Sequence, residues 1–361
     1  MIKLLVVDDS ALMRRLLGRV FTAEGDFQVE FARNGLEALA LLEPFGPDVV
    51  TLDVHMPQMD GLACLDRIML ARPCPVVMIS SLTEAGADVT LEAMQLGAVD
   101  FVPKPQGAMS LEIDDLAPLL VDKVRAAAQA RPRKSLRLAE RVRLRVGDPT
   151  MASPRPAARL PRSGIARPPL MGEGVVLVGT STGGPPALDA VLGPLPANFP
   201  WPIVVAQHMP ASFTGPLARR LDRLCALEVV EVVRPMPLQP GQVYIGRGDA
   251  DVILGTRPSG PVVLAAPSSP EHRWHPSVDR LVHSAMQHFH PERLVGVLMT
   301  GMGNDGAATM TRLRAAGGRT IAEAEETAVV WGMPGELVRA GGAEVVAPLD
   351  SIAAQLQGWL A

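Results

Sequence analysis

Aromatic residues and cysteines are scarce in this sequence. Phenylalanine, tryptophan and tyrosine together make up 4% of the 361 residues, so the aromatic platforms on which nucleic-acid bases stack are not expected. The three cysteines, Cys64, Cys74 and Cys225, form no CxxC pair. This pattern favours unpaired thiols that act as small apolar side chains in a reducing compartment.

Long apolar runs are also lacking. No stretch of eighteen apolar residues occurs, so no membrane span is expected. The apolar run at the N-terminus, MIKLLVV, is too short for a signal peptide and is followed by two aspartates. We therefore expect a cytoplasmic protein with no direct membrane insertion.

Neither sign of charge is in marked excess. The net charge of −4 provides no general reason to expect a nucleic-acid partner. Apolar residues make up 48% of the chain and charged residues 20%, which suits soluble globular domains with substantial cores. A chain of this length predicts two or more domains, and we expect a monomer.

Residues 1–125 alternate between short apolar runs and amphipathic stretches. The runs predict five strands, and the stretches between them predict helices. The predicted strands are 2–7, 27–32, 48–52, 75–79 and 98–102. Strands that alternate with helices indicate βαβ units, so we expect an α/β domain with a doubly wound parallel sheet of the flavodoxin-like kind.

Residues 126–172 have a different composition. Arginine and proline dominate, with alanine and serine between them, and no apolar face is sustained. We interpret this segment as a linker, in which the spacing at 135–146 allows a short basic helix. A solvated tether is the favoured interpretation, and a basic arm that contacts an acidic partner is the alternative.

Residues 173–361 resume the alternation of strands and helices. The apolar runs are 175–179, 201–208, 227–233, 242–246, 251–255, 261–265, 293–301, 319–324 and 343–347. They predict a second doubly wound, Rossmann-like α/β domain. Glycine and proline turns separate the short runs between 243 and 267, so we expect an antiparallel hairpin there, on the otherwise parallel sheet.

Polar residues follow several predicted strands of the first domain. Asp8 and Asp9 come directly after the first strand, and Asp53 follows the third. Because the carboxyl ends of parallel strands open onto one crevice, these carboxylates should converge and attract a hard cation such as Mg²⁺. Ser80 follows the fourth strand and Lys104 the fifth. A hydroxyl, an ammonium and a cation around a carboxylate form a phosphoryl site, so Asp53 is predicted to form an aspartyl phosphate.

The motifs VVDDS, LDVHMPQMDG, MISS and DFVPKP make residues 1–125 resemble the receiver domain of two-component response regulators. That resemblance implies a histidine kinase as phosphodonor. It assigns the Mg²⁺ site to Asp8 (through water), Asp9, Asp53 and the backbone carbonyl of His55. It also implies that Ser80 and Phe101 couple phosphorylation to conformational change, with Lys104 supporting the phosphoryl group.

The segment GTSTG (179–183) fits the pattern G-x-S-x-G between a predicted strand and a predicted helix. This is the context of a nucleophile elbow, in which glycines allow a sharp turn and the helix N-terminus favours an oxyanion. Ser181 is therefore a candidate nucleophile. The alternative is that GTSTGG is a loop that binds phosphate.

A serine nucleophile needs a base and an orienting carboxylate. His208 directly follows the next predicted strand, so it should face the same crevice as Ser181. Asp305 follows another strand in a glycine-rich loop and is the candidate carboxylate. The other histidines of the domain are expected in a loop that lines a substrate groove (His272 and His275) or at the surface (His283, His288 and His290).

Residues 173–361 resemble the catalytic domain of the chemotaxis protein-glutamate methylesterases, the CheB family. The resemblance rests on GTSTGGP, QHMPASFTGPLARRLD, PLQPGQVYIGRGDADVIL, HPSVDRL, LMTGMGNDGA and WGMPGELVRAGG. It assigns a triad to Ser181, His208 and Asp305, places Thr182 beside the nucleophile, and gives the backbone amide of Met302 an oxyanion contact. No cofactor is expected in this domain. Trp274 and His275 stand where the family usually has His-Arg, which we expect to alter the binding of receptor segments.

Together the two resemblances imply a phosphorylation-activated hydrolase. It would demethylate glutamate methyl esters and deamidate glutamines on methyl-accepting chemoreceptors, in adaptation in bacterial chemotaxis or in a related chemosensory pathway. The unphosphorylated receiver is expected to cover the Ser181 cleft. One alternative is a nucleotide-binding output module, with TGMGNDG as a second phosphate loop. A transcription factor is disfavoured by the acidic net charge and by the lack of a helix-turn-helix pattern.

Overall fold

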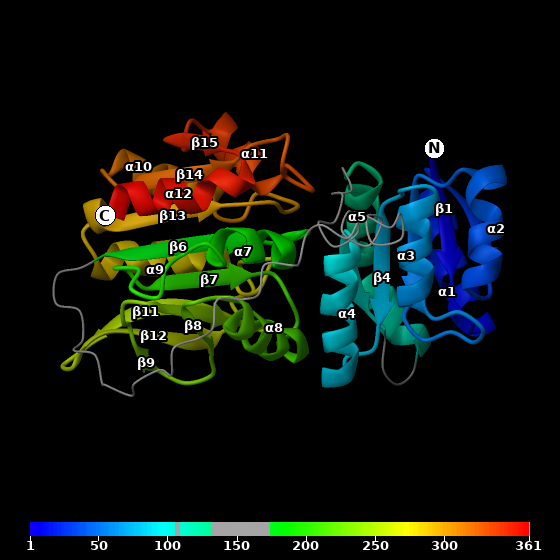
Figure 1. Cartoon of the computed structure of the whole chain (residues 1–361), viewed down its shortest axis with the longest axis horizontal. Helices are drawn as coiled ribbons and strands as arrows, with labels where there is room; N and C mark the ends of the chain where they lie inside the picture. Colours follow the sequence, from blue (N-terminus) through cyan, green and yellow to red (C-terminus); the bar gives the residue numbers. More distant parts are fainter. Residues whose placement is uncertain (105–108, 131–173, 361) are drawn as a thin grey trace, which may run out of the picture. The chain divides into compact units, whose positions relative to one another are not determined.

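The computed structural model describes residues 1–104, 109–130 and 174–360, which divide into two units, each with its own parallel sheet (Figure 1). The segment 131–173, which contains most of the expected linker and the basic stretch 135–146, lies outside the described residues. Within the described ranges, no helix is both long and apolar enough to cross a membrane.

The first unit is built around five strands that all pair in parallel. They are β1 (Ile2–Val7), β2 (Phe27–Ala32), β3 (Val49–Asp53), β4 (Val76–Ser80) and β5 (Asp100–Pro103). Their order across the sheet is β2-β1-β3-β4-β5. The flavodoxin-like sheet predicted from the alternating pattern is confirmed. Strands β1 and β2 have the predicted bounds, and the ends of β3, β4 and β5 are shifted by one or two residues.

Five helices cover this sheet. They are α1 (Ala11–Glu24), α2 (Gly35–Phe45), α3 (Gly61–Ala71), α4 (Glu84–Leu96) and α5 (Met109–Ala128). Helices α1 and α5 pack together on one face, whereas α2, α3 and α4 pack side by side on the other. The first four begin at a side-chain cap, which satisfies an otherwise unpaired backbone N–H of the first turn; the caps are Ser10, Asn34, Asp60 and Thr83.

The second unit contains a sheet of seven parallel strands. They are β6 (Val175–Thr180), β7 (Ile203–Gln207), β8 (Glu228–Val232), β10 (Gln242–Gly246), β13 (Leu294–Leu298), β14 (Arg319–Glu323) and β15 (Val345–Ala347). Their order is β15-β14-β13-β6-β7-β10-β8. Every residue of β6, β7 and β13 is buried, because helices cover both faces of a parallel sheet. Each buried valine or leucine there stabilises the fold by roughly 1.5–3 kcal/mol.

The predicted antiparallel hairpin exists, but its expected place on the parallel sheet was wrong. Strands β11 (Ala250–Arg257) and β12 (Gly260–Pro267) pair with each other and with the short β9 (Met236–Pro237) in a separate sheet. The preceding strand β10 takes a parallel place between β7 and β8. The hairpin instead packs against α9, where Val252, Leu254 and Val263 join the apolar core.

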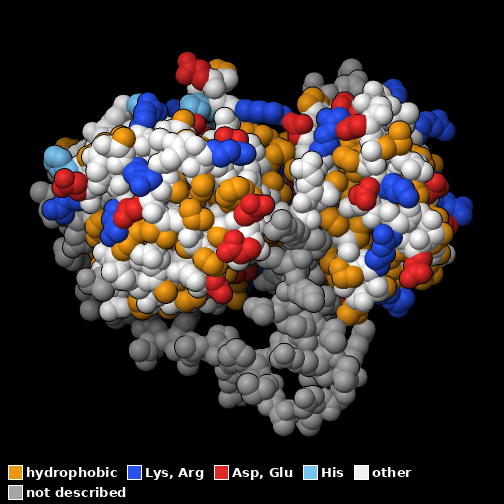
Figure 2. Space-filling view, turned by 90° about the horizontal axis from the view of Figure 1, so that it is seen from above, with side chains coloured by type: hydrophobic (Ala, Val, Ile, Leu, Met, Phe, Trp, Pro, Cys, Tyr) orange, Lys and Arg blue, Asp and Glu red, His pale blue; other side chains and the backbone are white. Residues whose placement is uncertain are grey.

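Helices lie on both faces of the seven-stranded sheet (Figure 1). They are α7 (Gly184–Leu192), α8 (Ala211–Leu224), α9 (Val278–His288), α10 (Ala307–Ala315), α11 (Met333–Arg339) and α12 (Leu349–Leu360), with a 3-10 turn at Pro291–Arg293. Helix α7 contacts α8 and α12, whereas α10 contacts α9 and α11. Basic and acidic side chains are interspersed on the surface shown in Figure 2.

Each sheet has a switch point, where consecutive connections leave in opposite directions. In the first unit it lies between β1 and β3, and in the second between β6 and β13. Ligands of open α/β sheets bind at the carboxyl ends of the strands around such points. The topology therefore selects two places for functional side chains, one in each unit.

Candidate active site and phosphoryl-acceptor site

The carboxylates of the first unit come together at its switch point. One oxygen from each of Asp8, Asp9 and Asp53 lies within 4.8 Å of the others. Asp8 and Asp53 are buried, whereas Asp9 is exposed. Burial raises the pKa of Asp8; the charge of Lys104 opposes this and that of Asp53 adds to it. The cluster is a place where added positive charge relieves repulsion.

Lys104 supplies one such charge. Its Nζ lies 2.7 Å from Asp53 Oδ2 and 3.1 Å from Asp8 Oδ2. Burial lowers the pKa of Lys104, but the hydrogen bond to Asp53 and the charges of both aspartates outweigh it, so the pKa lies above its ordinary value. The ammonium therefore stays charged beside Asp53, where it can meet a phosphoryl oxygen.

The same residues fit Mg²⁺. The set offers hard carboxylate oxygens and one exposed member, which is the donor chemistry that this ion prefers. Asp8 Oδ2 is buried and lies 3.1 Å from Lys104 Nζ, and the described residues supply no further donor to it. An oxygen with unused lone pairs at the centre of the cluster is what a cation ligand requires.

Three further residues predicted around Asp53, namely His55, Ser80 and Phe101, have different surroundings. The backbone N–H of His55 donates to Asp53 Oδ1 at 3.3 Å, so this residue lies beside the predicted acceptor. Ser80 Oγ donates to the carbonyl of Gly86 in α4 at 3.2 Å. Phe101 is buried, with the Lys123 ammonium 5.2 Å from its ring centroid.

Ser181 and His208 follow adjacent parallel strands of the second unit. The register pairs Thr180 with Gln207, so the next residue on each strand is the serine and the histidine. The backbone N–H of His208 donates to the Thr180 carbonyl at 3.1 Å, and that of Ser181 donates to the Thr300 carbonyl at 3.0 Å. These bonds hold the predicted nucleophile and base at the switch point.

Asp305 completes the cluster. Its Oδ2 lies 2.8 Å from His208 Nε2 and accepts from the backbone N–H of Val278 at 2.7 Å. Its Oδ1 accepts from the Asp279 N–H at 3.0 Å and from Ser277 Oγ at 3.1 Å. Burial raises the pKa of Asp305, but the hydrogen bond and charge of His208 and the two amides outweigh it, so the net shift is downward. The carboxylate is thus held ionised at the N-terminus of α9.

The imidazole orientation follows from this contact. An ionised carboxylate can only accept hydrogen bonds, so Nε2 of His208 carries the proton. Nδ1 is then the basic nitrogen; it is buried and has no hydrogen-bond partner among the residues that the structure describes. His208 directly follows β7, the strand next to the one that leads to Ser181. Its Nδ1 is therefore the atom available to take the serine proton.

A helix N-terminus, Thr182 and the loop that contains Met302 surround Ser181. Helix α7 begins at Gly184, so its N-terminus lies three residues after the serine. Thr182 is buried, and its carbonyl accepts from Thr300 Oγ1 at 2.8 Å. The loop that contains Met302 lies close, since a Cβ atom on Gly301 would come within 2.8 Å of Ser181 Cβ.

Gln207 is a residue of this site that was not predicted from the sequence. Gln207 Nε2 donates to the carbonyl of Ser181 at 3.1 Å and to that of His208 at 3.0 Å. A single amide thus ties the backbones of the nucleophile and the base together. A signal was available, because a buried polar side chain directly before the base must find partners.

The remaining histidines lie at several different places. His283, His288 and His290 are exposed, as predicted. His275 Nδ1 lies 2.9 Å from Asp251, and His272 Nδ1 lies 3.3 Å from Ser277 Oγ. The loop that carries these two is therefore tied to buried polar groups of the protein.

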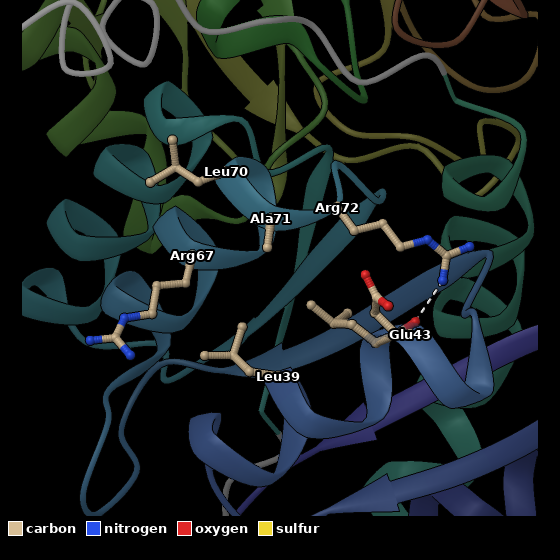
Figure 3. Close-up of a pocket in the computed structure, with 7 residues that line it drawn as sticks. Leu39, Glu43, Arg67, Leu70, Ala71 and Arg72 are labelled. Atoms are coloured by element: carbon tan, nitrogen blue, oxygen red, sulfur yellow. Dashed lines mark hydrogen bonds between the residues drawn. The ribbon is translucent and has the colours of Figure 1, made fainter. Parts of the chain in front are cut away.

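A groove in the first unit is separate from both sites (Figure 3). It lies between α2 and α3, where the guanidinium of Arg72 donates to the carbonyl of Leu42 at 2.6 Å. Its lining residues are Leu39, Leu42, Glu43, Arg67, Leu70, Ala71 and Arg72. None of them belongs to the carboxylate cluster or to the Ser181 cluster.

The two sites define the class of protein. The first unit carries a carboxylate and lysine cluster, typical of a phosphoryl acceptor, on a flavodoxin-like sheet. The second unit carries a Ser-His-Asp cluster on another α/β sheet. This combination in one chain is typical of a response regulator whose output domain is a serine hydrolase.

Comparisons with known proteins narrow this class to a family. The family model described as CheB methylesterase matches residues 176–356, and the one described as response regulator receiver domain matches residues 4–113. Protein-glutamate methylesterase/protein-glutamine glutaminase 2 of Rhodopseudomonas palustris is 60% identical, over 99% of this chain and 98% of that protein. Protein-glutamate methylesterase/protein-glutamine glutaminase 3 of Rhodospirillum rubrum is 55% identical, over 100% of this chain and 96% of that protein. The chain belongs to the CheB family of protein-glutamate methylesterases.

A solved structure supports the assignment of the second unit. The crystal structure of the Thermotoga maritima CheB methylesterase catalytic domain superposes with a TM-score of 0.51 and 37% sequence identity. It covers 52% of this chain and 100% of that domain. The likeness therefore concerns the hydrolase unit alone.

Proposed function

We propose that this protein is a phosphorylation-activated hydrolase that removes methyl groups from glutamate methyl esters on chemoreceptors and deamidates glutamines there. Its relatives are named for the two activities, protein-glutamate methylesterase and protein-glutamine glutaminase. The observation that carries the proposal is the buried His208–Asp305 pair, whose free Nδ1 lies one residue past the strand beside Ser181.

The proposed reaction begins with attack of Ser181 Oγ on the ester carbonyl carbon. His208 Nδ1 takes the hydroxyl proton, and the carbonyl oxygen becomes an oxyanion. The bond to the methoxy group then breaks, and the proton on Nδ1 passes to the leaving oxygen to give methanol. Nδ1 next takes a proton from water, the hydroxide attacks the acyl-enzyme, and Ser181 leaves with that proton. An amide follows the same path and releases ammonia.

One set of groups stabilises the imidazolium, and another stabilises the oxyanion. The Asp305 carboxylate, held by four donors, keeps the proton on Nε2 and balances the imidazolium. The backbone amide of Met302 and the N-terminus of α7, with Thr182 beside the nucleophile, are the groups proposed to receive the oxyanion. None of these steps involves a cofactor.

In the receiver unit, Asp53 is the proposed phosphoryl acceptor, and a histidine kinase of the chemosensory pathway is the donor. Asp8, Asp9, Asp53 and the carbonyl of His55 would hold Mg²⁺, which neutralises phosphoryl charge when bound. Lys104 is already placed to pair with a second phosphoryl oxygen. Ser80 would exchange its Gly86 partner for the phosphoryl group, and Phe101 would respond to that shift.

The proposal includes an architecture and a place of action. Residues 1–125 form the receiver, 126–172 the linker and 173–361 the catalytic domain of a monomer. We place the protein in the cytoplasm, where its three buried cysteines would remain in the reduced thiol form. Burial raises the pKa of Cys64 and of Cys74 to about 12, which keeps both thiols protonated and unreactive.

The test is methanol release from methyl-labelled chemoreceptor membranes, with and without a small-molecule phosphodonor and Mg²⁺. The full-length protein should release methanol, faster with the phosphodonor. Ser181→Ala should release none while keeping its fold. Equal release by Ser181→Ala and the native protein would overturn the assignment of the nucleophile and favour a binding role for GTSTGG.

A further inference from the structure

Trp274 lies against the catalytic base. Its ring is stacked on the His208 imidazole, with centroids 5.5 Å apart and planes inclined by 8°. A Cβ atom on Gly303 would come within 3.3 Å of Trp274 Nε1, so the indole also borders the loop that leads to Asp305. The Arg273 guanidinium lies 4.9 Å from the centroid of the same ring. One side chain thus contacts the base and borders the loop that carries its carboxylate.

The loop that holds Trp274 is anchored by a buried charge outside the triad. Asp251, on β11, is fully buried. Its carboxylate accepts from the backbone N–H of Ser277 at 2.7 Å and of Ser269 at 3.2 Å, and lies 2.9 Å from His275 Nδ1. The Arg280 guanidinium, at the start of α9, donates to it as well.

These contacts form a continuous path to the triad. Asp251 holds the backbone of Ser277, and the Ser277 hydroxyl donates to Asp305. Asp251 also holds His275, the residue directly after Trp274. The buried carboxylate of Asp251 therefore holds both the residue that follows Trp274 and the helix start that binds Asp305.

We propose that Trp274 is a positioning residue for His208, and that Asp251 anchors it. The indole holds the imidazole in the orientation that leaves Nδ1 for Ser181, because a stacked ring opposes rotation about the side-chain torsion. Trp274 then affects kcat, and its role is not confined to the choice of receptor segment. The inference rests on the triad of the proposed function.

The experiment combines turnover with a direct view of the imidazole. The chain has seven histidines, so full-length protein labelled with ¹³C in its histidine rings gives few ring signals, and His208→Gln identifies that of His208. Trp274→Leu removes the stacked ring, and Trp274→Phe keeps one. Asp251→Asn loosens the anchor. Asp189→Asn, which breaks the ion pair between α7 and α8 with Arg220, is the matched control.

We expect Trp274→Leu to shift the His208 ring signals and to lower kcat on the order of tenfold to a hundredfold, as small misplacements of catalytic groups do, with KM near that of the native protein. Trp274→Phe should recover most of both readouts. Asp251→Asn should shift the same signals and lower kcat, whereas Asp189→Asn should change neither.

Unchanged His208 signals and kcat in Trp274→Leu would overturn the proposal. A change confined to KM would do so too, and would make Trp274 a substrate contact. If the native protein shows no turnover, the proposed function fails, while the ring signals still report on positioning.

Discussion

At the scale of the residue, Asp305 is the side chain around which the proposed active site is organised. Four donors reach its two oxygens, and three of them come from the segment 277–279. An ionised carboxylate accepts hydrogen bonds at both oxygens, so Asp305 keeps the imidazole proton of His208 on Nε2. The geometry therefore predicts a strict requirement for a carboxylate.

Asp305→Asn should lower kcat by roughly 10³–10⁴-fold, the size of effect known for this change in serine hydrolases. The amide can donate to Nε2, which moves the imidazole proton to Nδ1 and removes the acceptor for the Ser181 proton. Methanol release checks this, with the melting temperature as a control for folding. A loss below tenfold in folded protein would exclude Asp305 from the triad.

Gly184 is a second place where one atom matters. A Cβ atom there would come within 1.9 Å of Gln207 Oε1, so Gly184→Ala should displace the amide that ties Ser181 to His208. We expect kcat to fall about tenfold or more. Gly358→Ala, with open space around the new methyl, should leave kcat unchanged and stabilise α12 by roughly 0.5–1 kcal/mol.

At the scale of the element, the N-terminus of α9 serves both the fold and the site. Ser277 caps the helix by accepting from the Arg280 N–H, and its hydroxyl also donates to Asp305. The first turn turns backbone amides toward the same carboxylate. The helix is stabilised by the acid that it positions.

Ser277→Ala should therefore affect two quantities. Loss of the cap should lower the free energy of unfolding by about 1 kcal/mol, and loss of the donor to Asp305 should lower kcat. Asn34→Ala removes a comparable cap, that of α2 in the other unit, and should leave the kcat of the hydrolase unaltered. Equal kcat in both variants would contradict a role of Ser277 in the site.

The anchor of the Trp274 loop makes a prediction about pH and stability. Burial raises the pKa of Asp251, but the hydrogen bonds from His275, Ser277 and Arg280 outweigh it, so the folded pKa lies below the ordinary value of 3.8. The contribution of Asp251 to folding is then complete above about pH 3.8 and is lost as pH falls through the folded pKa.

Asp251→Asn should accordingly be less stable than the native protein at pH 7, on the order of 3 kcal/mol because a buried ion pair is broken. The difference should shrink below about pH 3.8. Urea unfolding followed by tryptophan fluorescence measures it, since all four tryptophans lie beyond residue 173. A difference that grows on acidification would contradict this assignment.

At the scale of the whole molecule, two sites of different chemistry share one chain. The receiver site gathers three carboxylates and a lysine, whereas the hydrolase site is built from a serine, a histidine and one carboxylate. Each lies at the switch point of its own sheet. The chemistry of the hydrolase site is complete within its own unit, so the receiver is expected to act on its rate and not on its mechanism.

Asp53→Asn should therefore keep the basal rate of methanol release and lose its rise with phosphodonor and Mg²⁺, because the acceptor oxygen is gone. Asp305→Asn, by contrast, should lose both. The measurement is initial rates with and without the phosphodonor. Full activation of Asp53→Asn would show that another group accepts the phosphoryl.

The sequence alone was enough to predict which polar residues end strands. Asp8, Asp53 and Ser80 follow or end short runs of apolar residues, and parallel sheets direct such positions to one edge. Ser181 and His208 follow from the same rule. Local periodicity determines these elements, and their alternation determines the doubly wound topology in both units.

Only the tertiary structure decided how the sites are supported. Asp251, Trp274 and Gln207 come from a hairpin, a loop and a strand end. Gln207 and Trp274 contact triad residues, and Asp251 reaches Asp305 through Ser277, so these contacts join residues distant in sequence. The hairpin likewise forms a separate sheet, and its apolar face is buried by packing against α9. Such contacts depend on register and side-chain packing across elements, which no local pattern of one segment encodes.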